Sequence, residues 1–249
     1  MATPRALILT GYGINCDEET KFAFEKAGAL ADLTHINDLI GSPSKLDDYQ
    51  IVAFPGGFSY GDDIGSGNAL AWKIKNNLGV ERFVKGDRLV IGICNGFQVL
   101  VNLGLLPALE NRYGERQVAL VYNNSARYSD RWVDIEFSGK SPWIIDLSRM
   151  SVPIAHGEGK FYADPTTLQE MSRRNIIAAR YVEGEICLYQ ILPANPNGSI
   201  GDIAGIADET GRIFGLMPHP ERAIHFTHLP HWTFLKEKYQ RQGREIPEE

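Results

Sequence analysis

The sequence predicts an α/β fold: a mostly parallel sheet flanked by helices, with additional antiparallel strands in the second half. Over residues 1–100, short runs that are apolar throughout alternate with segments of helical periodicity. Strands buried on both faces of a parallel sheet have this pattern. From about residue 116, apolar and polar residues alternate instead, which is typical of antiparallel strands with one solvated face.

The composition indicates an ordinary globular protein. The chain has 249 residues, of which 43% are hydrophobic and 22% are charged, and this length is sufficient to bury a large core. No internal repeat or low-complexity linker divides it, so we expect a single domain over residues 1–249. The net charge is −6 and there is no basic block, which argues against nucleic acid as a partner.

The sequence also favours a cytoplasmic location and no membrane partner. No apolar run approaches the ~20 residues needed to cross a bilayer, and the N-terminus leads into a predicted strand without the apolar core of a signal peptide. The three cysteines, Cys16, Cys94 and Cys187, are far apart and odd in number, as in a reducing compartment. Because no cysteine or histidine pair has zinc-site spacing, we expect no metal ligands.

Apolar runs and turn residues give the expected elements in chain order. In the first half they predict strands at residues 6–10, 31–36, 50–54 and 88–91. A helix should span about Asp17 to Lys26 and stop at Gly28, and another should follow Cys94 until Gly104. In the second half we expect strands at 117–122, 131–137, 176–182, 186–191 and 212–217, a turn-rich segment at 153–161 and a turn at 195–199.

Cys94 lies where a predicted strand turns sharply into a predicted helix, between Gly92 and Gly96. This arrangement is typical of a nucleophile elbow, whose strained turn exposes the reactive atom among small neighbours. The helix N-terminus favours the thiolate, and the backbone N–H of Asn95 can stabilise an oxyanion formed there. The alternative is a buried structural cysteine. Cys16 also follows a strand but lacks flanking small residues.

The glycine-rich segment 55–67 follows the third predicted strand. In a parallel sheet this loop and the Cys94 turn both lie at carboxyl ends of strands, where ligands bind in such folds. A flexible surface connection remains the alternative. No Gly-Lys-Ser/Thr follows it, which argues against a phosphate loop, and residues 11–16 do not complete a dinucleotide fingerprint, because the third glycine position is Cys16.

His219 and Glu221 follow the last predicted strand and are separated by one residue, Pro220. In an extended segment both side chains point to the same side, and the flanking prolines stiffen that geometry. A carboxylate beside an imidazole orients the ring, as the third member of a catalytic triad does. A surface loop is the alternative reading. We expect the histidines at 225, 228 and 231 at a surface or interface, and the one at 35 to be structural.

Together, the G-x-C-x-G-x-Q turn at residues 92–98 and the later H-x-E at 219–221 resemble the triad (class I) glutamine amidotransferases. Four further stretches are similar to the glutaminase subunits of phosphoribosylformylglycinamidine synthases, which act in purine biosynthesis. These stretches are residues 13–17, 55–62, 155–159 and 195–199. The matches run from about residue 6 to 222 and imply the flavodoxin-like class I glutaminase fold.

The resemblance implies that Cys94 attacks the side-chain amide of glutamine, that His219 transfers protons and that Glu221 orients His219. It further implies backbone N–H groups of Gly57 and Asn95 as the oxyanion hole. By the same resemblance, Gln98 would contact the glutamine substrate.

The resemblance also implies a division of labour between this chain and its partners. It implies no cofactor in this chain, with ATP and magnesium on a larger synthetase subunit, with or without a small accessory subunit. That subunit would use the ammonia to convert formylglycinamide ribonucleotide to formylglycinamidine ribonucleotide. We expect the docking surface around residues 156–160.

Three alternatives stay open at this point. A thiol hydrolase of the same fold, such as a peptidase or a glutamyl-chain hydrolase, could use the same three residues on another amide. A catalytically silent subunit could only scaffold a partner, although it would have no need for Cys94, His219 and Glu221 together. Residues 63–67 are closer to the glutaminase portion of large fused synthases than to the small bacterial subunits, so the type of assembly is also open.

Overall fold

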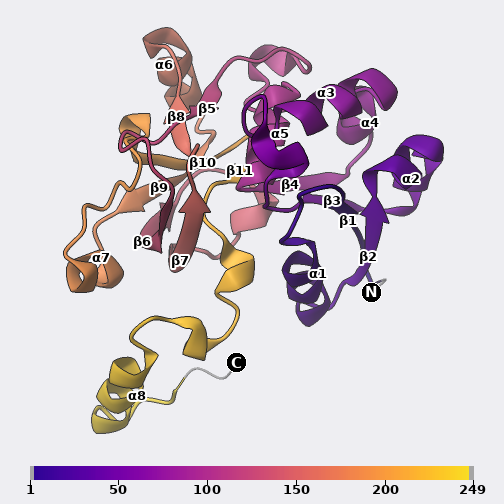
Figure 1. Cartoon of the computed structure of the whole chain (residues 1–249). Helices are drawn as coiled ribbons and strands as arrows, with labels where there is room; N and C mark the ends of the chain where they lie inside the picture. Colours follow the sequence, from indigo (N-terminus) through magenta and orange to yellow (C-terminus); the bar gives the residue numbers. More distant parts are fainter. Residues whose placement is uncertain (1–2, 247–249) are drawn as a thin grey trace.

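A nine-stranded sheet forms the centre of the computed structural model, which describes residues 3–246 (Figure 1). Its strands lie in the order β2-β1-β3-β4-β11-β10-β9-β6-β7, and β5 pairs with β8 in a separate two-stranded sheet. The strands are β1 (Arg5–Thr10), β2 (Leu30–His35), β3 (Ile51–Phe54), β4 (Leu89–Ile93), β5 (Ala119–Val121), β6 (Ser129–Phe137), β7 (Arg149–His156), β8 (Lys160–Tyr162), β9 (Ile177–Val182), β10 (Ile203–Ala207) and β11 (Ile213–Leu216).

The predicted change from parallel to antiparallel pairing is confirmed, and it occurs at β11. Strands β2, β1, β3, β4 and β11 are mutually parallel, whereas β10, β9, β6 and β7 continue the sheet with antiparallel pairs. In β1, Leu7 and Leu9 belong to the larger core cluster, and Ala6 and Ile8 belong to a smaller one. This strand is therefore buried on both faces, which explains its unbroken apolar sequence.

Helices cover both faces of the parallel half of the sheet. The helices are α1 (Asp17–Lys26), α2 (Ile36–Gly41), α3 (Asn68–Asn77), α4 (Glu81–Val84), α5 (Asn95–Asn102), α6 (Pro165–Arg173), α7 (Glu185–Gln190) and α8 (Trp232–Arg241). Helix α1 packs on the face of the small cluster through Phe24, and α5 packs on the other face. The bounds predicted for α1 are confirmed; Asp17, Glu18 and Glu19 in its first turn complement the helix dipole.

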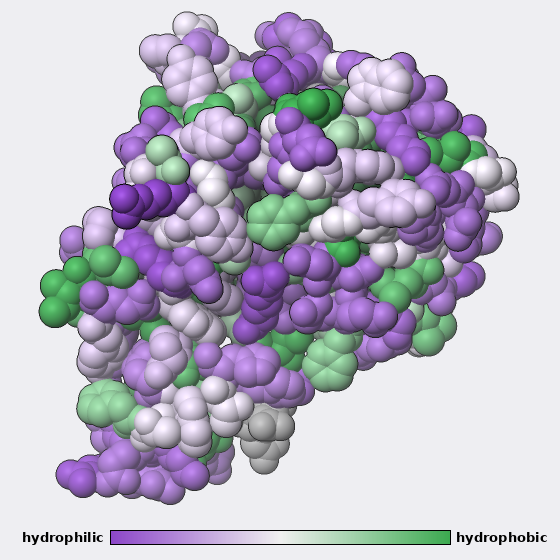
Figure 2. All heavy atoms as spheres, in the orientation of Figure 1, coloured by the Kyte–Doolittle hydropathy of each residue, from purple (hydrophilic) through white to green (hydrophobic). Residues whose placement is uncertain are grey.

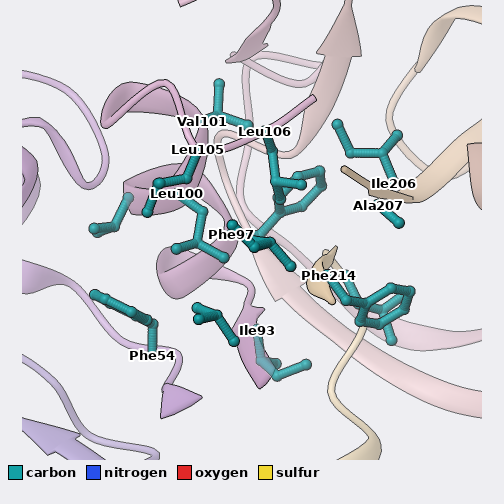
Figure 3. Packing of buried hydrophobic residues seen from close by; sticks show 14 of the residues in the cluster. Phe54, Ile93, Phe97, Leu100, Val101, Leu105, Leu106, Ile206, Ala207 and Phe214 are labelled. Atoms are coloured by element: carbon teal, nitrogen blue, oxygen red, sulfur yellow. The ribbon is translucent and has the colours of Figure 1, made fainter. Parts of the chain in front are cut away.

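Helix α5 sits directly on the ends of the neighbouring strands. Phe97 is fully buried among residues of several elements, including Phe214 of β11 (Figure 3). A Cβ on Gly215 would lie 2.1 Å from the Phe97 ring, and a Cβ on Gly96 would lie 1.8 Å from the carbonyl oxygen of Phe54. These contacts leave no room for a larger residue at either glycine. The position of the turn before α5 is therefore fixed by packing.

The prediction of a strand at residues 186–191 is wrong, because this segment forms helix α7. A short apolar run does not by itself distinguish a strand from a helix. Here the Asp134 carboxylate accepts a hydrogen bond from the backbone N–H of Cys187 at 3.1 Å, in the first turn of α7. That turn is where helical N–H groups lack internal partners and negative charge is favourable. Leu188 and Ile191 remain 73% and 91% exposed, so the apolar run does not mark a buried strand.

The segment predicted to be rich in turns is in large part strand β7, which ends at His156. Pro153 obscured this in the sequence, since proline cannot donate to a sheet ladder. Strand β7 is the edge of the nine-stranded sheet and pairs only with β6 there. An edge strand tolerates proline, and this one places its carboxyl end near the turn at β11, where the Pro153 carbonyl accepts the N–H of His219 at 2.8 Å.

The C-terminal helix α8 stands apart from the central sheet (Figure 1). On the face shown in Figure 2, apolar residues form small patches among hydrophilic ones. Among the helices of residues 3–246, none is long and apolar enough to span a bilayer.

Candidate active site

Cys94 occupies the tight turn between β4 and α5, as predicted. Its backbone has φ 51° and ψ −107°, a left-handed conformation that is strained for a residue with a side chain. Its N–H donates to the Leu216 carbonyl at 2.8 Å, which continues the β4–β11 ladder by one residue. The side chain is buried, and its Sγ lies 3.7 Å from the carbonyl oxygen of Ala155 at the end of β7. Three elements therefore hold one sulfur atom in place.

His219 and Glu221 follow β11, the strand adjacent to β4, so the topology brings them to the Cys94 turn. The imidazole Nδ1 of His219 lies 2.5 Å from Oε1 of Glu221, and both side chains are buried. Because the carboxylate only accepts, Nδ1 carries the proton in this pair. Nε2 is then the atom available for proton transfer. A carboxylate fixes the tautomer and orientation of a catalytic histidine in this way.

The surroundings of His219 favour its charged form. Burial alone would lower the pKa of His219, but the charges of Cys94 and Glu221, together with contacts to the Cys16 and Cys94 sulfurs, raise this pKa well above its usual value. Among the described residues, Nε2 has no hydrogen bond of good geometry. An imidazolium beside a sulfur stabilises the thiolate, the nucleophilic form of cysteine. The arrangement is suited to covalent catalysis on an acyl group.

Asn95 directly follows Cys94, and Gly57 lies two residues before Ser59, whose N–H donates to Asn95 Oδ1 at 3.3 Å. Asn95 is the first residue of α5, where backbone N–H groups have no partner within the helix. In the bridge between Ile14 and Gly57, the N–H of Asn15 donates to the Gly56 carbonyl and the N–H of Phe58 donates to the Gly13 carbonyl. The N–H of Gly57 is not used in this bridge. Gly57 has φ 147°, and a Cβ there would lie 2.6 Å from the Gly13 carbonyl oxygen. The position therefore requires glycine.

Gln98 is buried, and its amide is engaged within the protein. Its Oε1 accepts from Asn95 Nδ2 at 3.0 Å, and its Nε2 donates to the Glu158 carbonyl. The Glu158 carboxylate accepts the backbone N–H of Ser66 at 3.2 Å. Asp62 also accepts from Asn95, and burial raises the pKa of Asp62, with the charge of Glu158 adding to the effect. In the sequence, Asp62 is only part of a stretch similar to the family and Glu158 only part of the expected docking loop, because contacts between distant loops alone show their place in the site.

Cys16, the rival cysteine, is fully buried in the same site. Its Sγ accepts from the Arg222 guanidinium at 2.8 Å. The ligand atoms of Cys16, His219 and Glu221 all lie within 4.8 Å of one another. Cys16 therefore lies beside the imidazole, and its backbone φ of −111° lacks the strained turn that holds Cys94 at φ 51°.

The loop at residues 156–160, which is predicted to form a docking surface, is bonded to the rest of the protein. His156 is buried, and its Nδ1 lies 3.1 Å from Oδ1 of Asn123. The His156 side chain is therefore bonded inside the protein, whereas Gly157, Glu158 and Lys160 are partly exposed. Asn123 also accepts the N–H of Gly159 at 3.2 Å, and Asn197 donates to the Gly159 carbonyl at 2.8 Å. The loop is held from within and faces Gln98, so it lines the site.

Acidification is expected to destabilise the fold through His156. Burial and, to a smaller extent, the nearby charge of His219 lower the pKa of His156 from 6.5 to about 3. Below about pH 6.5 the unfolded chain takes up a proton that the folded chain does not. The stability contributed by neutral His156 is thus complete above pH 6.5 and is lost as the pH falls toward 3. Two pH units below the unfolded pKa, the loss is about 2–3 kcal/mol.

Urea unfolding of the wild type and of His156→Gln between about pH 7 and pH 4.5 measures this loss. The variant should show a shallower fall in unfolding free energy over this range, because its side chain does not titrate. His228→Gln serves as the matched control, since His228 is exposed. Parallel pH curves for the wild type and His156→Gln would contradict the prediction.

The remaining histidines have other roles. His35 caps α2 by accepting the N–H of Asn37 at 3.2 Å, so the prediction of a structural role is confirmed. His228 is exposed, and His225 and His231 are partly exposed. They lie on the segment between β11 and α8, away from the Cys94 turn in the view of Figure 1.

Comparisons with known proteins were consistent with one another. Residues 3–246 match the CobB/CobQ-like glutamine amidotransferase domain. The chain is 50% identical over 249 residues to the phosphoribosylformylglycinamidine synthase subunit PurQ of Methanococcus maripaludis, with 98% of this chain and 92% of that protein covered. The corresponding subunit of Dehalococcoides mccartyi is 42% identical, with 99% and 96% covered. A chain in the structure of PurLQS from Thermotoga maritima is 30% identical with a TM-score of 0.71, covering 98% of this chain and 100% of that one.

Proposed function

The chain belongs to the CobB/CobQ-like glutamine amidotransferases, among the PurQ subunits of phosphoribosylformylglycinamidine synthase, and on this premise we propose that Cys94, His219 and Glu221 are its catalytic residues. The enzyme hydrolyses glutamine to glutamate and ammonia. The ammonia is supplied to the synthetase subunit, which forms formylglycinamidine ribonucleotide in purine biosynthesis. The observation that carries the assignment of residues is the buried His219–Glu221 pair, with 2.5 Å between Nδ1 and Oε1, next to the strained Cys94 turn.

In this mechanism the Cys94 thiolate attacks the side-chain amide carbon of glutamine. The amide oxygen takes up negative charge, and the backbone N–H groups of Gly57 and Asn95 stabilise it. Losing one such donor typically costs ~10²–10³ in rate. The tetrahedral intermediate collapses as His219 Nε2 donates a proton to the departing nitrogen, which releases ammonia and leaves a thioester on Cys94.

Water then hydrolyses the thioester. His219, now neutral, takes a proton from the water as it attacks the acyl carbon, and the carbon–sulfur bond breaks to give glutamate and the thiolate. Glu221 keeps Nδ1 protonated throughout, so that Nε2 alone exchanges protons. The positive charge that His219 regains is again stabilised by Cys94 and Glu221.

We also propose that Gln98 helps to bind glutamine, together with the 156–160 loop. The Asp62 carboxylate accepts from Asn95, the Glu158 carboxylate accepts from Ser66, and the charge of Glu158 acts on Asp62. We propose that these two carboxylates supply negative charge for the α-ammonium group of the substrate. A direct contact from Gln98 requires its Nε2 to leave the Glu158 carbonyl. Without that exchange, Gln98 acts by holding Glu158 in place.

The proposal includes a larger synthetase subunit, with or without a small accessory subunit, as the partner. ATP and magnesium are assigned to that subunit, and no cofactor is assigned to this chain. Ammonia at neutral pH is mostly protonated and unreactive, which explains the need for direct transfer.

We place the docking surface around Phe58 and Tyr128, half-exposed rings whose centroids lie 6.1 Å apart beside the site. Burial and the charge of Cys94 raise the pKa of Tyr128.

We also propose that residues 1–249 form a single domain and that the protein is cytoplasmic. One continuous sheet containing β1 through β11, apart from the β5–β8 pair, supports the single domain. The three cysteines are all unpaired, in accord with a reducing compartment.

The test is ammonia release from glutamine by the purified chain, alone and with the synthetase subunit and its nucleotides. We expect glutamine hydrolysis that rises when the partner is present. A glutamyl-peptide substrate distinguishes the thiol hydrolase alternative: turnover of the peptide without turnover of free glutamine would refute the amidotransferase function. Absence of turnover in every setting would favour the silent scaffold instead.

A further inference from the structure

Glu158 lies in the short loop between β7 and β8, and it bonds to two other segments of the chain. Its carbonyl oxygen accepts from Gln98 Nε2 in α5, and its carboxylate accepts the backbone N–H of Ser66 at 3.2 Å. Ser66 belongs to the glycine-rich segment 55–67. The position of the Glu158 carboxylate therefore depends on how its own loop is held.

Asn123 bonds to the backbone on both sides of Glu158. Its Nδ2 donates to the His156 carbonyl at 2.9 Å, and its backbone N–H donates to the Gly157 carbonyl at 2.9 Å. Its Oδ1 accepts the N–H of Gly159 at 3.2 Å. The Asn123 side chain is buried, and buried amides of this kind are normally fully bonded. One side chain and its own N–H thus fix three backbone groups that flank Glu158.

Asn197 holds the far end of the same loop, and the turn at residues 195–199 fixes Asn197. Its Nδ2 donates to the Gly159 carbonyl at 2.8 Å. Its Oδ1 accepts the backbone N–H of Ser199 at 2.9 Å and the Ser199 hydroxyl at 2.8 Å. The same hydroxyl accepts the N–H of Phe161 in β8 at 2.9 Å. Because both ends of the amide are bonded, Asn197 has one orientation, which it imposes on the loop.

We propose that Asn123 and Asn197 are positioning residues that set the specificity for the α-ammonium group of the substrate, because they fix the Glu158 carboxylate. This inference rests on the proposed function, in which Glu158 supplies negative charge for that group. Neither asparagine takes part in the proposed proton transfers or in the oxyanion hole. A hydrogen bond between charged groups depends on distance and alignment. Loss of either asparagine should therefore weaken the ammonium contact and leave the chemistry at Cys94 unchanged.

Two compounds that differ only in the ammonium group test the proposal. Glutaramate (4-carbamoylbutanoate) has the side-chain amide and the carboxylate of glutamine but no α-ammonium group. In the chain assembled with its synthetase subunit, Asn123→Ala and Asn197→Ala should each raise KM for glutamine by about 10–100-fold, the range for a hydrogen bond between charged groups. Their kcat, and the inhibition constant of glutaramate against glutamine hydrolysis, should stay within about twofold of the wild type.

Misfolding does not produce this result, because a smaller folded fraction lowers the apparent kcat and moves neither KM nor the inhibition constant. Ser199→Ala is a milder variant that removes only the hydroxyl bonded to Asn197 Oδ1, and it should raise KM for glutamine by a smaller factor. Asn124→Ala is the matched control. Asn124 is an exposed asparagine next to Asn123, and its side chain accepts from Lys160 at 2.8 Å. This control should leave all three constants unchanged.

Glu158→Gln separates the inference from the proposed function. This variant keeps the loop and removes the charge, so it should raise KM for glutamine and leave the inhibition constant of glutaramate unchanged. If it changes both constants equally or neither, the α-ammonium role of Glu158 fails, and the inference fails with it. If Glu158→Gln is selective but Asn123→Ala and Asn197→Ala are not, the asparagines do not position Glu158, and the inference alone is overturned.

Discussion

Replacing Cys94 with alanine is expected to lower kcat for glutamine hydrolysis by about 10⁴-fold or more, as removal of a catalytic nucleophile does in other hydrolases. In the proposed mechanism the backbone turn that holds Cys94 also contributes to the oxyanion hole, and alanine keeps this turn. What is lost is the sulfur atom that we propose forms the thioester. The variant should therefore still bind glutamine, and its residual rate should no longer depend on the synthetase subunit. Measuring ammonia release with and without the partner gives the residual rate of the variant and shows whether that rate depends on the synthetase subunit.

Cys187→Ala is the control for this variant, because Cys187 is also buried but lies on α7, outside the site. It should retain full activity. Cys16→Ala tests the rival cysteine in the same assay and should retain measurable thioester formation. Activity that survives Cys94→Ala but is lost in Cys16→Ala would refute Cys94 as the nucleophile and assign that role to Cys16.

The positions of Cys94, His219 and Glu221 could be predicted because their signals are local in the sequence. Strand β4 is apolar on both faces, Gly92 and Gly96 allow a tight turn, and the structure confirms that Cys94 lies in that turn. His219 and Glu221 are two residues apart, so one short segment fixes their relation. The parallel pairing of β4 with β11 then follows from the fold class and brings the two segments together.

The residues that surround Cys94, His219 and Glu221 could not be predicted, because their contacts join segments that are distant in the sequence. Arg222 and Cys16 are 206 residues apart, and neither residue type by itself indicates a contact with the other. His156 has the same difficulty. The four residues after it are glycines and charged residues, which suggest a surface loop, whereas hydrogen bonds with Asn123 and Asn197 hold this loop in the interior. Buried polar networks of this kind depend on tertiary packing. Hydrophobic periodicity and turn residues report only local structure, so they do not predict such networks.

Replacing Glu221 with glutamine is expected to lower kcat by about 10²–10⁴-fold, the range seen when the orienting carboxylate of a triad becomes an amide. Glutamine is nearly isosteric, but its amide can donate to Nδ1 and so favour the wrong imidazole tautomer. The substitution also removes the negative charge of Glu221, which stabilises the protonated form of His219. The loss should therefore appear in both the acylation and the hydrolysis of the thioester, since His219 transfers a proton in each.

The pH profile separates this role from a merely structural one. Burial alone lowers the pKa of His219, and the charges of Cys94 and Glu221 raise it well above its usual value; without the Glu221 charge it must fall. Imidazolium is then lost at a lower pH, so the alkaline limb of kcat/KM should move to lower pH in Glu221→Gln. Glu185→Gln, which alters an exposed carboxylate paired with Lys238 at 3.0 Å, should leave the limb in place. If Glu221→Gln lowers the rate without moving the alkaline limb, Glu221 supports the fold and does not tune His219.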